Sequence, residues 1–241
     1  MSKKDRQVAT RVGQLAPDKY LNDEKVDRLF RFVSKRAAGL SKRAAINRMI
    51  VAILIGSGLR ANELLDLKLL DCPCCHGTDV IDVRCGKGNI SRVVDIDPVL
   101  SEQIREFVKT YRKRAKPGAV LIPSEAGHRR IEVKKIRRIG GVPTAYYRVE
   151  RSCRMQYQNL YDKMIRLGKN AGIGHLTPHM FRHTFGILLY NVQQDLLYVR
   201  DQMGHADIKT TQIYAQTANK KRRAQMKGIS PVWKDNNNNI L

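Results

Sequence analysis

Apolar residues recur at helical spacing along most of the chain. In residues 21–37, Leu29, Phe30 and Val33 fall on one face and follow the capping residue Asn22, which is typical of an amphipathic helix with a defined start. The same spacing predicts a helix that follows Ser41 and ends at Gly56, a short helix over residues 61–69, and helices over 97–115, 155–173, 178–192, 195–203 and 209–218. The chain is therefore expected to be mostly helical.

Short β-prone runs interrupt the helical pattern in the middle of the chain. Residues 79–84 and 91–97 flank the glycine-rich turn "CGKGN", which predicts a hairpin with Lys87 at its tip. Residues 119–123 could add a strand, and residues 127–151 form two β-prone arms around "GGVP". The predicted fold class is therefore mostly α with a small antiparallel β-sheet (α+β).

The charge of the chain indicates what kind of partner it binds. The 241 residues include 45 Lys and Arg against 22 Asp and Glu, a formal net charge of +23. So large an excess indicates a polyanionic partner, with nucleic acid as the first candidate. A membrane partner is not expected, because no long basic amphipathic helix stands out and the apolar run at residues 49–56 is too short to span a bilayer.

The pattern also divides the chain. Residues 1–19 are basic and aperiodic and are expected to be a flexible arm, residues 20–225 are expected to form one domain, and residues 226–241 a partly disordered tail rich in asparagine. The N-terminus lacks the apolar stretch of a secretory signal, and five cysteines, an odd number, do not indicate a disulfide framework. These features indicate a cytoplasmic protein.

Three of the six histidines lie in the stretch "HLTPHMFRHTFG" at residues 175–186. The "TP" within it is a helix start, since threonine caps and proline fits the first helical position. On the helix that follows, His179, Arg182 and His183 fall opposite the apolar residues. The polar face of this helix therefore concentrates imidazole and guanidinium groups near a helix N-terminus.

A metal site, a phosphate site and a plain solvated face are all open interpretations of this stretch. His179 and His183 have the i, i+4 spacing of zinc ligands, but Arg182 lies between them and no acidic or cysteine ligand is near in the sequence. A helix N-terminus with an arginine fork and an imidazole donor is suited to an oxyanion. The phosphate site is therefore favoured.

A phosphate site that performs chemistry needs further groups, and the chain offers them far apart in sequence. Arg60 lies at a helix start and Glu63, three residues later, is expected to support it. Lys87 lies at the hairpin tip, His205 follows a helix end, and Tyr214 comes nine residues after His205. Each of these alone also has an ordinary structural explanation, so it is their combination that points to chemistry.

The order of these motifs resembles the tyrosine recombinases, also called phage-type integrases. "GLRANELL", "GKGN" in a hairpin, "HMFRH", "MGH" and then the tyrosine follow one another over about residues 20–220, which resembles the family's catalytic domain. The resemblance implies the tyrosine recombinase/integrase catalytic-domain fold and an enzyme that cuts and rejoins duplex DNA without a cofactor. It implies as partners double-stranded DNA with a specific recombination site and further copies of the chain, dimer to tetramer on DNA. It leaves room for an accessory DNA-bending protein and implies a nucleoid-associated location in the cytoplasm.

Carried over by motif, the resemblance assigns Tyr214 as the nucleophile that holds the 3′-phosphate of the cut strand. Lys87 would protonate the 5′-oxygen leaving group. Tyrosine has a free pKa near ~10, so it is a poor nucleophile unless its proton is removed and its anion stabilised. Lysine can act as the acid where neighbouring cations lower its pKa.

The remaining assignments surround the phosphate. Arg60 and Arg182 would clamp its non-bridging oxygens, His205 would donate a further hydrogen bond, and His179 would act as general base or phosphate ligand. Planar guanidiniums suit a transition state that spreads negative charge over these oxygens, and lysine would not replace them equally. With charge neutralised by side chains, the chemistry requires no metal.

Two stretches within the expected domain depart from the family pattern. The segment 127–151 is a longer basic insertion than the pattern contains, and it could follow a DNA backbone or groove or be a solvated charged loop. Its basic residues are Arg129, Arg130, Lys134, Lys135, Arg137, Arg138 and Arg148. The stretch "CPCCH" could form a zinc site from Cys72, Cys75, His76 and Cys85, but without a second C-x-x-C pair free cysteines are favoured.

Two other functions remain open from the sequence. A type IB topoisomerase-like enzyme would relax DNA by the same chemistry without strand exchange. A non-catalytic DNA-binding regulator would keep the fold alone, and the intact set of six site residues argues against it. The favoured function is site-specific recombination through a 3′-phosphotyrosyl intermediate, for integration, excision or inversion of DNA.

Overall fold

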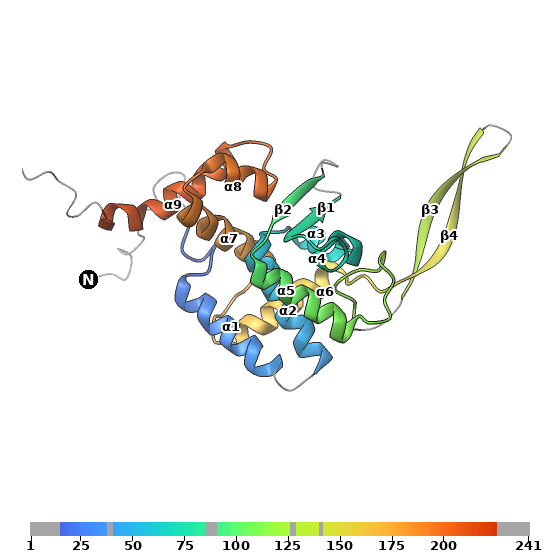
Figure 1. The fold of residues 1–241 in the computed structure, drawn as a ribbon, viewed down its shortest axis with the longest axis horizontal. Helices are drawn as coiled ribbons and strands as arrows, with labels where there is room; N and C mark the ends of the chain where they lie inside the picture. Colours follow the sequence, from blue (N-terminus) through green and yellow to red (C-terminus); the bar gives the residue numbers. More distant parts are fainter. Residues whose placement is uncertain (1–14, 38–40, 85–90, 126–128, 140–141, 226–241) are drawn as a thin grey trace, which may run out of the picture.

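A computed structural model describes residues 15–37, 41–84, 91–125, 129–139 and 142–225, and for residues 129–139, 142–152 and 219–225 it describes the backbone alone. The helices form one body, and a long two-stranded ribbon leaves it (Figure 1). The helices are α1 (Asp23–Ala37), α2 (Lys42–Ser57), α3 (Ala61–Asp66), η1 (Leu69–Asp71), α4 (Pro73–His76), α5 (Pro98–Tyr111), α6 (Tyr157–Asn170), α7 (Pro178–Gln193), α8 (Leu196–Met203) and α9 (Lys209–Gln225). The strands are β1 (Val80–Val83), β2 (Arg92–Asp95), β3 (Arg129–Ile139) and β4 (Val142–Ser152).

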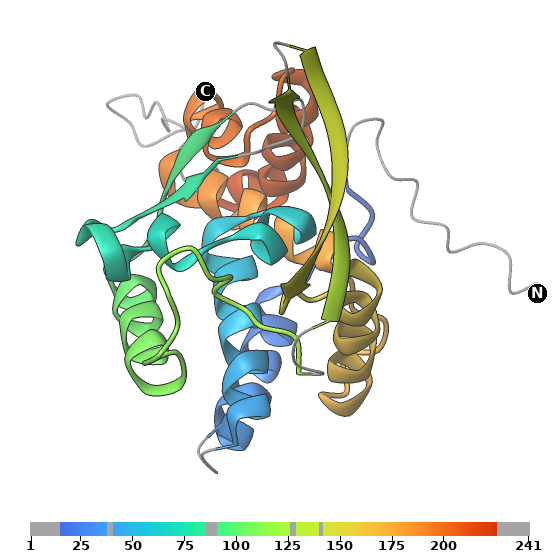
Figure 2. The ribbon, with the colours of Figure 1, turned by 90° about the vertical axis from the view of Figure 1, so that its right-hand side faces the viewer.

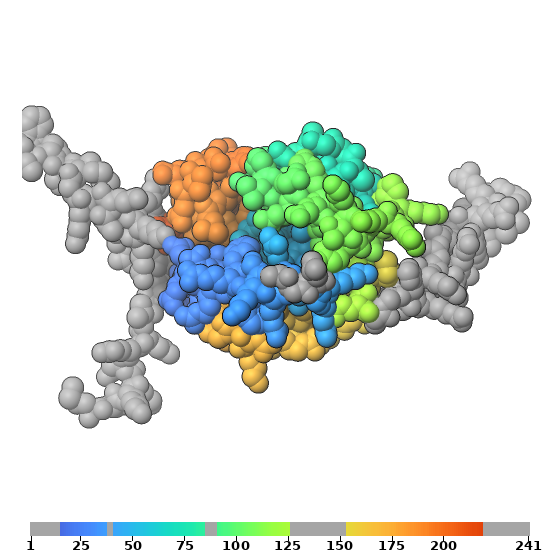
Figure 3. All heavy atoms as spheres, turned by 60° about the horizontal axis from the view of Figure 1, so that its bottom comes forward, coloured from blue at the N-terminus to red at the C-terminus, as the bar shows by residue number. Residues whose placement is uncertain are grey.

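Helix α2 is the centre of the body. It is apolar around its whole circumference, with buried residues on every turn, as expected of a helix enclosed by others. It packs against α1, α5 and α7 (Figure 2). On the face shown in Figure 3, α1 in blue and α5 in green lie at the surface. Among the described residues, no helix is both long and apolar enough to cross a membrane.

The helix starts follow from side-chain caps. Asn22 accepts a hydrogen bond from the N–H of Lys25 at 3.0 Å, and Thr177 accepts one from Met180 at 3.4 Å. Such caps satisfy N–H groups that lack a partner in the first turn. The starts predicted at Asn22 and at the "TP" pair are therefore confirmed.

A second apolar cluster lies beside the main core. It is made by α7, α8 and α9, and its buried members are Phe185, Tyr190, Val199, Met203, Tyr214 and Ala218. Leu15, which lies within the expected N-terminal arm, joins this cluster and donates its N–H to Thr217 at 3.1 Å. The candidate nucleophile is thus part of a hydrophobic core.

Both hairpins expected from the sequence are present. Strands β1 and β2 pair antiparallel from Val80↔Asp95 to Val83↔Arg92. Strands β3 and β4 pair from Arg129↔Ser152 to Ile139↔Val142 and extend away from the helices. The expected basic insertion is therefore a two-stranded ribbon.

One expected strand and several helix boundaries are wrong, including the helix expected over 97–115, which ends at Tyr111. Residues 119–123 form no strand, because only isolated bridges join Val120 to Lys68 and Pro123 to Arg154. The helix expected over 61–69 ends at Asp66, since Leu67 turns to extended backbone and accepts a hydrogen bond from the N–H of Leu121. The last helix continues past residue 218 to Gln225.

Candidate active site

The turn between α2 and α3 begins the site. Gly58 caps α2 with a φ of 61°, and a Cβ atom at this position would lie 2.1 Å from Cδ1 of Phe185. Glycine is therefore required twice, for the left-handed backbone and for the close approach of the ring. The turn places Arg60 at the start of α3 and leaves the Gly58 carbonyl facing α7.

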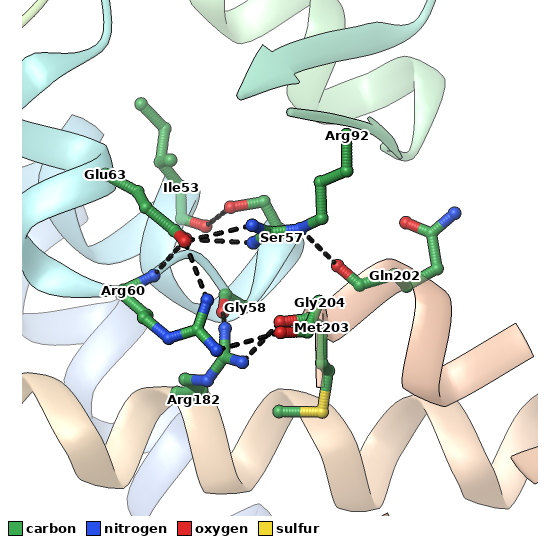
Figure 4. Close-up of polar contacts among 10 residues, drawn as sticks. All are labelled: Ile53, Ser57, Gly58, Arg60, Glu63, Arg92, Arg182, Gln202, Met203 and Gly204. Carbon is green, nitrogen blue, oxygen red and sulfur yellow. Dashed lines mark hydrogen bonds and ion pairs between the residues drawn. The ribbon is translucent and has the colours of Figure 1, made fainter. Parts of the chain in front are cut away.

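Arg60 is held by two neighbours. Its Nη1 contacts Glu63 Oε1 at 2.8 Å, and its backbone N–H donates to Glu63 Oε2 at 2.8 Å. Its Nη2 donates to the carbonyl of Gly204 at 2.9 Å. The expected support of Arg60 by Glu63 is confirmed, and the guanidinium is also tied to the end of α8 (Figure 4).

Arg182 projects from the first turns of α7 toward the same place. It is only 3% exposed, and its guanidinium donates to the carbonyl of Gly58 at 2.6 Å and to that of Met203. Burial, and then the neighbouring Arg60, lower the pKa of Arg182 to about 10. It therefore stays charged at neutral pH, beside Arg60 (Figure 4).

The turn after α8 supplies His205. Gly204 ends α8 with a φ of 61°, and His205 follows it with Nδ1 at 3.1 Å from the hydroxyl of Thr211. Burial, and then Arg182 and Arg60, lower the pKa of His205 to about 4. At neutral pH its imidazole is uncharged and can act as a hydrogen-bond donor.

Tyr214 lies on α9 and is 1% exposed. Its hydroxyl shares a hydrogen bond of 3.3 Å with Nδ1 of His183, and its ring centroid lies 6.1 Å from that of His205. The ring packs on Gly186, where a Cβ atom would come within 2.7 Å of Cζ. Burial raises the pKa of Tyr214 to about 12, although Arg182 and Arg60 oppose the shift.

Two histidines of α7 lie near this tyrosine, and the ring centroid of His183 is 5.9 Å from that of Tyr214. His179 is exposed, and its ring centroid lies 4.2 Å from that of His183. Partial desolvation of its ring, and then Arg182 and Arg60, lower the pKa of His179. Burial, and then His179 and Arg182, lower the pKa of His183 to about 4. The structure thus brings the described candidates from α3, α7, α8 and α9 into one region, while Lys87 and Cys85 lie outside the described residues.

The "CPCCH" stretch is folded as the short helix α4. Cys72 is buried and donates its thiol to the carbonyl of Lys68 at 3.2 Å, and burial raises its pKa, which disfavours the thiolate that zinc requires. Cys75 is exposed, and Nδ1 of His76 contacts the Thr78 hydroxyl. Within the described part of the chain, no group of three or more His, Cys, Asp or Glu residues could hold a metal ion.

Arg92 is the site neighbour that sequence reasoning missed. It reaches from β2 to Glu63 and makes a two-pronged ion pair with the carboxylate at 2.9 and 2.8 Å. The contact between His183 and Tyr214 was equally invisible in the sequence. No spacing signal links a strand residue to a helix residue 29 positions away.

The lowered pKa values of His183 and His205 predict a loss of stability on acidification. Both are near 4 in the folded chain against about 6.5 for an unperturbed histidine. Between these values the unfolded chain binds protons that the folded chain does not bind, so the free energy of unfolding falls as pH drops from about 6.5 to about 4.

Urea unfolding of the wild type and of a His183→Asn, His205→Asn variant at several pH values measures this effect. The variant is expected to show a shallower slope in this window. Glu63, whose pKa is near 2, contributes only as pH falls below about 4.5. A wild-type unfolding free energy that is flat from pH 6.5 to 4 contradicts the prediction.

A comparison with known protein families identifies the family of this chain. The sequence model of the phage integrase family matches residues 19–221. The chain belongs to the phage integrase family. The resemblance to the tyrosine recombinases predicted from the sequence is therefore confirmed.

Relatives and solved structures of this family agree with the assignment. Tyrosine recombinase XerA of Thermococcus kodakarensis is 31% identical over 182 residues, which is 75% of this chain and 55% of that protein. Tyrosine recombinase XerH of Helicobacter pylori is 27% identical over 230 residues, 93% of this chain and 55% of that protein. The chain thus spans about half the length of these phage integrase relatives.

The solved structures show the same fold. A crystal structure of XerA recombinase superposes with a TM-score of 0.66 at 21% identity, covering 93% of this chain and 66% of that chain. A XerH site-specific recombinase bound to a palindromic difH substrate gives 0.62 at 24%, covering 87% and 53%. The predicted phage integrase fold, mostly α with a small antiparallel sheet, is confirmed.

Proposed function

We propose that this chain is the catalytic part of a site-specific DNA recombinase that cleaves and rejoins duplex DNA through a 3′-phosphotyrosyl intermediate. One observation carries the proposal: Arg60 and Arg182, 122 positions apart in the sequence, are both fixed by carbonyls of the turn at Met203 and Gly204. His205 and Tyr214 continue from that turn. Two guanidiniums and an imidazole can bind the non-bridging oxygens of a phosphodiester, and a phenol beside them can attack its phosphorus.

The two arginines are the electrostatic part of the mechanism. When the Tyr214 oxygen attacks phosphorus, negative charge grows on the non-bridging oxygens, and fixed cations stabilise that charge more than the starting diester. Both arginines are held by backbone carbonyls before DNA binds. They therefore need little reorganisation in the transition state.

Cleavage requires two proton transfers, one from the Tyr214 hydroxyl and one to the 5′-oxygen. The bond from the Tyr214 oxygen to phosphorus forms, the bond from phosphorus to the 5′-oxygen breaks, and the phenolic proton leaves as the 5′-hydroxyl gains one. Lys87 is the proposed acid and His179 the proposed base or phosphate ligand. With a pKa near 12 for Tyr214 and near 4 for His183, the phenol stays protonated in the free protein. Because the Tyr214 side chain is only 1% exposed, its hydroxyl must also become accessible before a duplex phosphate can reach it.

Rejoining reverses these steps. The phosphotyrosine bond conserves the energy of the phosphodiester, so a 5′-hydroxyl can attack it without ATP. A 5′-hydroxyl from a second duplex gives recombination, and this exchange needs a homo-oligomer of two to four chains on DNA. The proposed substrate is double-stranded DNA with a specific site, as in the XerH structure bound to difH substrate, and the proposed location is the nucleoid.

A nicked suicide duplex tests the function. The wild-type chain is mixed with nicked duplexes made from the DNA that flanks its own gene, and a protein–DNA adduct is expected because the short 5′ fragment diffuses away. Tyr214→Phe is expected to give no adduct, since no other oxygen occupies that position. Tyr198→Phe is the matched control, because Tyr198 instead donates its hydroxyl to Asp95 at 3.1 Å.

The outcomes separate the alternatives. A wild type that binds these duplexes but forms no adduct indicates the non-catalytic regulator. An adduct together with relaxation of supercoiled plasmid, but without exchange between two sites, indicates the topoisomerase-like enzyme. An adduct that persists in Tyr214→Phe shows that the assigned nucleophile is wrong.

The β3–β4 ribbon is proposed as a DNA-binding arm. Each strand has 11 residues, so at about 3.4 Å per residue the ribbon extends roughly 37 Å. A two-stranded ribbon fits the major groove of B-DNA, and the ribbon carries the seven basic residues noted in the sequence.

Replacing Arg137 and Arg138 with glutamine tests this arm. DNA affinity is expected to fall, and the slope of log K against log salt is expected to lessen by about 0.9 for each phosphate that the ribbon no longer neutralises. The control is the pair Arg31→Gln and Arg36→Gln on α1. If both pairs change affinity and slope equally, the ribbon is a solvated charged surface.

A further inference from the structure

All three guanidinium nitrogens of Arg92 donate hydrogen bonds to other groups of the protein. Its side chain is 10% exposed, and Nη1 and Nη2 contact Oε1 and Oε2 of Glu63 at 2.9 and 2.8 Å. Its Nε donates to the carbonyl of Gln202 at 3.1 Å. One side chain from β2 therefore joins α3 to the end of α8 (Figure 4).

Glu63 receives two arginines on one carboxylate. Besides the fork of Arg92 it accepts the backbone N–H and Nη1 of Arg60, each at 2.8 Å, and its side chain is 4% exposed. Burial alone would raise the pKa of Glu63, but the hydrogen bonds from Arg92 and Arg60 lower it to about 2. The carboxylate is thus ionised, and each of its oxygens accepts hydrogen bonds from both Arg92 and Arg60.

The Nε and Cδ atoms of Arg92 contact the end of α8, where the carbonyls that hold Arg60 and Arg182 lie. A Cβ atom on Gly204 would lie 2.9 Å from Cδ of Arg92, so the side chain packs directly on this turn. The neighbouring carbonyls of Met203 and Gly204 accept hydrogen bonds from Arg182 and Arg60. Displacement of the turn would therefore move the partners of both guanidiniums.

Strand β2 is itself fixed against α8. The side-chain amide of Gln202 donates to Asp95 Oδ2 at 2.6 Å, and its oxygen accepts the Asp95 N–H at 3.0 Å. The strand that carries Arg92 is therefore hydrogen-bonded to α8. A flexible surface arginine would not hold a second residue in place.

We propose that Arg92 is a positioning residue of the phosphate clamp. It orients Arg60 through Glu63 and holds the α8 turn against which Arg182 is fixed, and it does not itself contact the phosphate. The inference rests on the proposed function, since it assigns a role within the same site. Lysine cannot replace this role, because one ammonium cannot span both carboxylate oxygens and the Gln202 carbonyl.

The test uses the full chain and two nicked substrates. One carries the natural scissile phosphate, and the other carries a methylphosphonate, in which a neutral methyl replaces one charged non-bridging oxygen. On the natural phosphate, Arg92→Gln and Arg92→Lys are expected to lower the single-turnover rate of adduct formation about 10- to 100-fold. DNA affinity is expected to stay close to that of the wild type.

The methylphosphonate is the readout that a merely structural role would not move. With less charge to stabilise, a misplaced arginine clamp matters less, so the ratio of wild-type to variant rate is expected to shrink to within a few-fold. The matched control is Arg105→Gln, which removes an arginine that contacts Asp79 and Glu102 outside the site. Its rates on both substrates are expected to equal those of the wild type.

Each outcome decides the proposal. Equal defects on both substrates, or a natural-phosphate rate equal to the wild type, overturn the role of Arg92 in the clamp. If Arg92→Gln melts below the assay temperature, Arg92→Lys, which keeps the charge and loses the fork, decides on the same two substrates. A wild type without any adduct refutes the proposed function, whereas a wild-type adduct with unimpaired variants refutes the inference alone.

Discussion

Replacing Arg182 with lysine is expected to lower the rate of covalent adduct formation by about 10²- to 10³-fold, the usual cost of losing a donor to a developing oxyanion. The guanidinium of Arg182 contacts the carbonyls of Gly58 and Met203 and has further N–H groups for a phosphate. A lysine ammonium is a point charge that cannot hold this planar geometry. Single-turnover cleavage of the nicked duplex measures the loss.

The control for this prediction is Arg166→Lys, the same change at an exposed position on α6. Melting temperatures of both variants are recorded first, and rates are compared well below the lower one. DNA affinity of Arg182→Lys is expected to change much less than its rate. A rate within a few-fold of the wild type would show that Arg182 is not part of the clamp.

Replacing Gly58 with alanine is expected to lower the free energy of unfolding more than any other substitution proposed for this protein. The residue has a φ of 61°, and the new Cβ would lie 2.1 Å from the ring of Phe185. The left-handed backbone costs roughly 1–2 kcal/mol for a residue with a side chain, and overpacking a core costs typically about 1–3 kcal/mol more. We expect a decrease in the free energy of unfolding of about 2–5 kcal/mol, measured by urea denaturation.

Gly77 provides a matched control for this change. It has a φ of 75°, and a Cβ atom at this position would meet nothing within 4 Å, so Gly77→Ala incurs the backbone cost without the clash. The difference between the two variants isolates the contact with Phe185. If both variants lose the same stability, the packing of Phe185 against the turn contributes nothing.

The sequence predicted the helical elements and the groups of the site because both leave local marks. Caps such as Asn22 and the periodic apolar faces mark helices, and the motif around Arg182 predicts a phosphate site. Side-chain partners across the fold leave no such mark, which is why the fork of Arg92 on Glu63 and the burial of Tyr214 appear only in three dimensions. The apolar run at 119–123 predicted a strand, but its residues form no continuous ladder: only isolated bridges join Val120 to Lys68 and Pro123 to Arg154. The catalytic roles of Lys87 and of the other assigned site residues stay predictions.

The carbonyls around Arg182 have a consequence for the free protein. A neutral carbonyl oxygen orients a guanidinium without cancelling its charge, and Arg60 and Arg92 share the single carboxylate of Glu63. The group therefore keeps an excess of positive charge at a partly buried place, where like charges repel. We expect this repulsion to lower the stability of the free protein. Under the proposed function, the charge of a bound DNA phosphate would offset the repulsion, and the recovered free energy would contribute to DNA affinity.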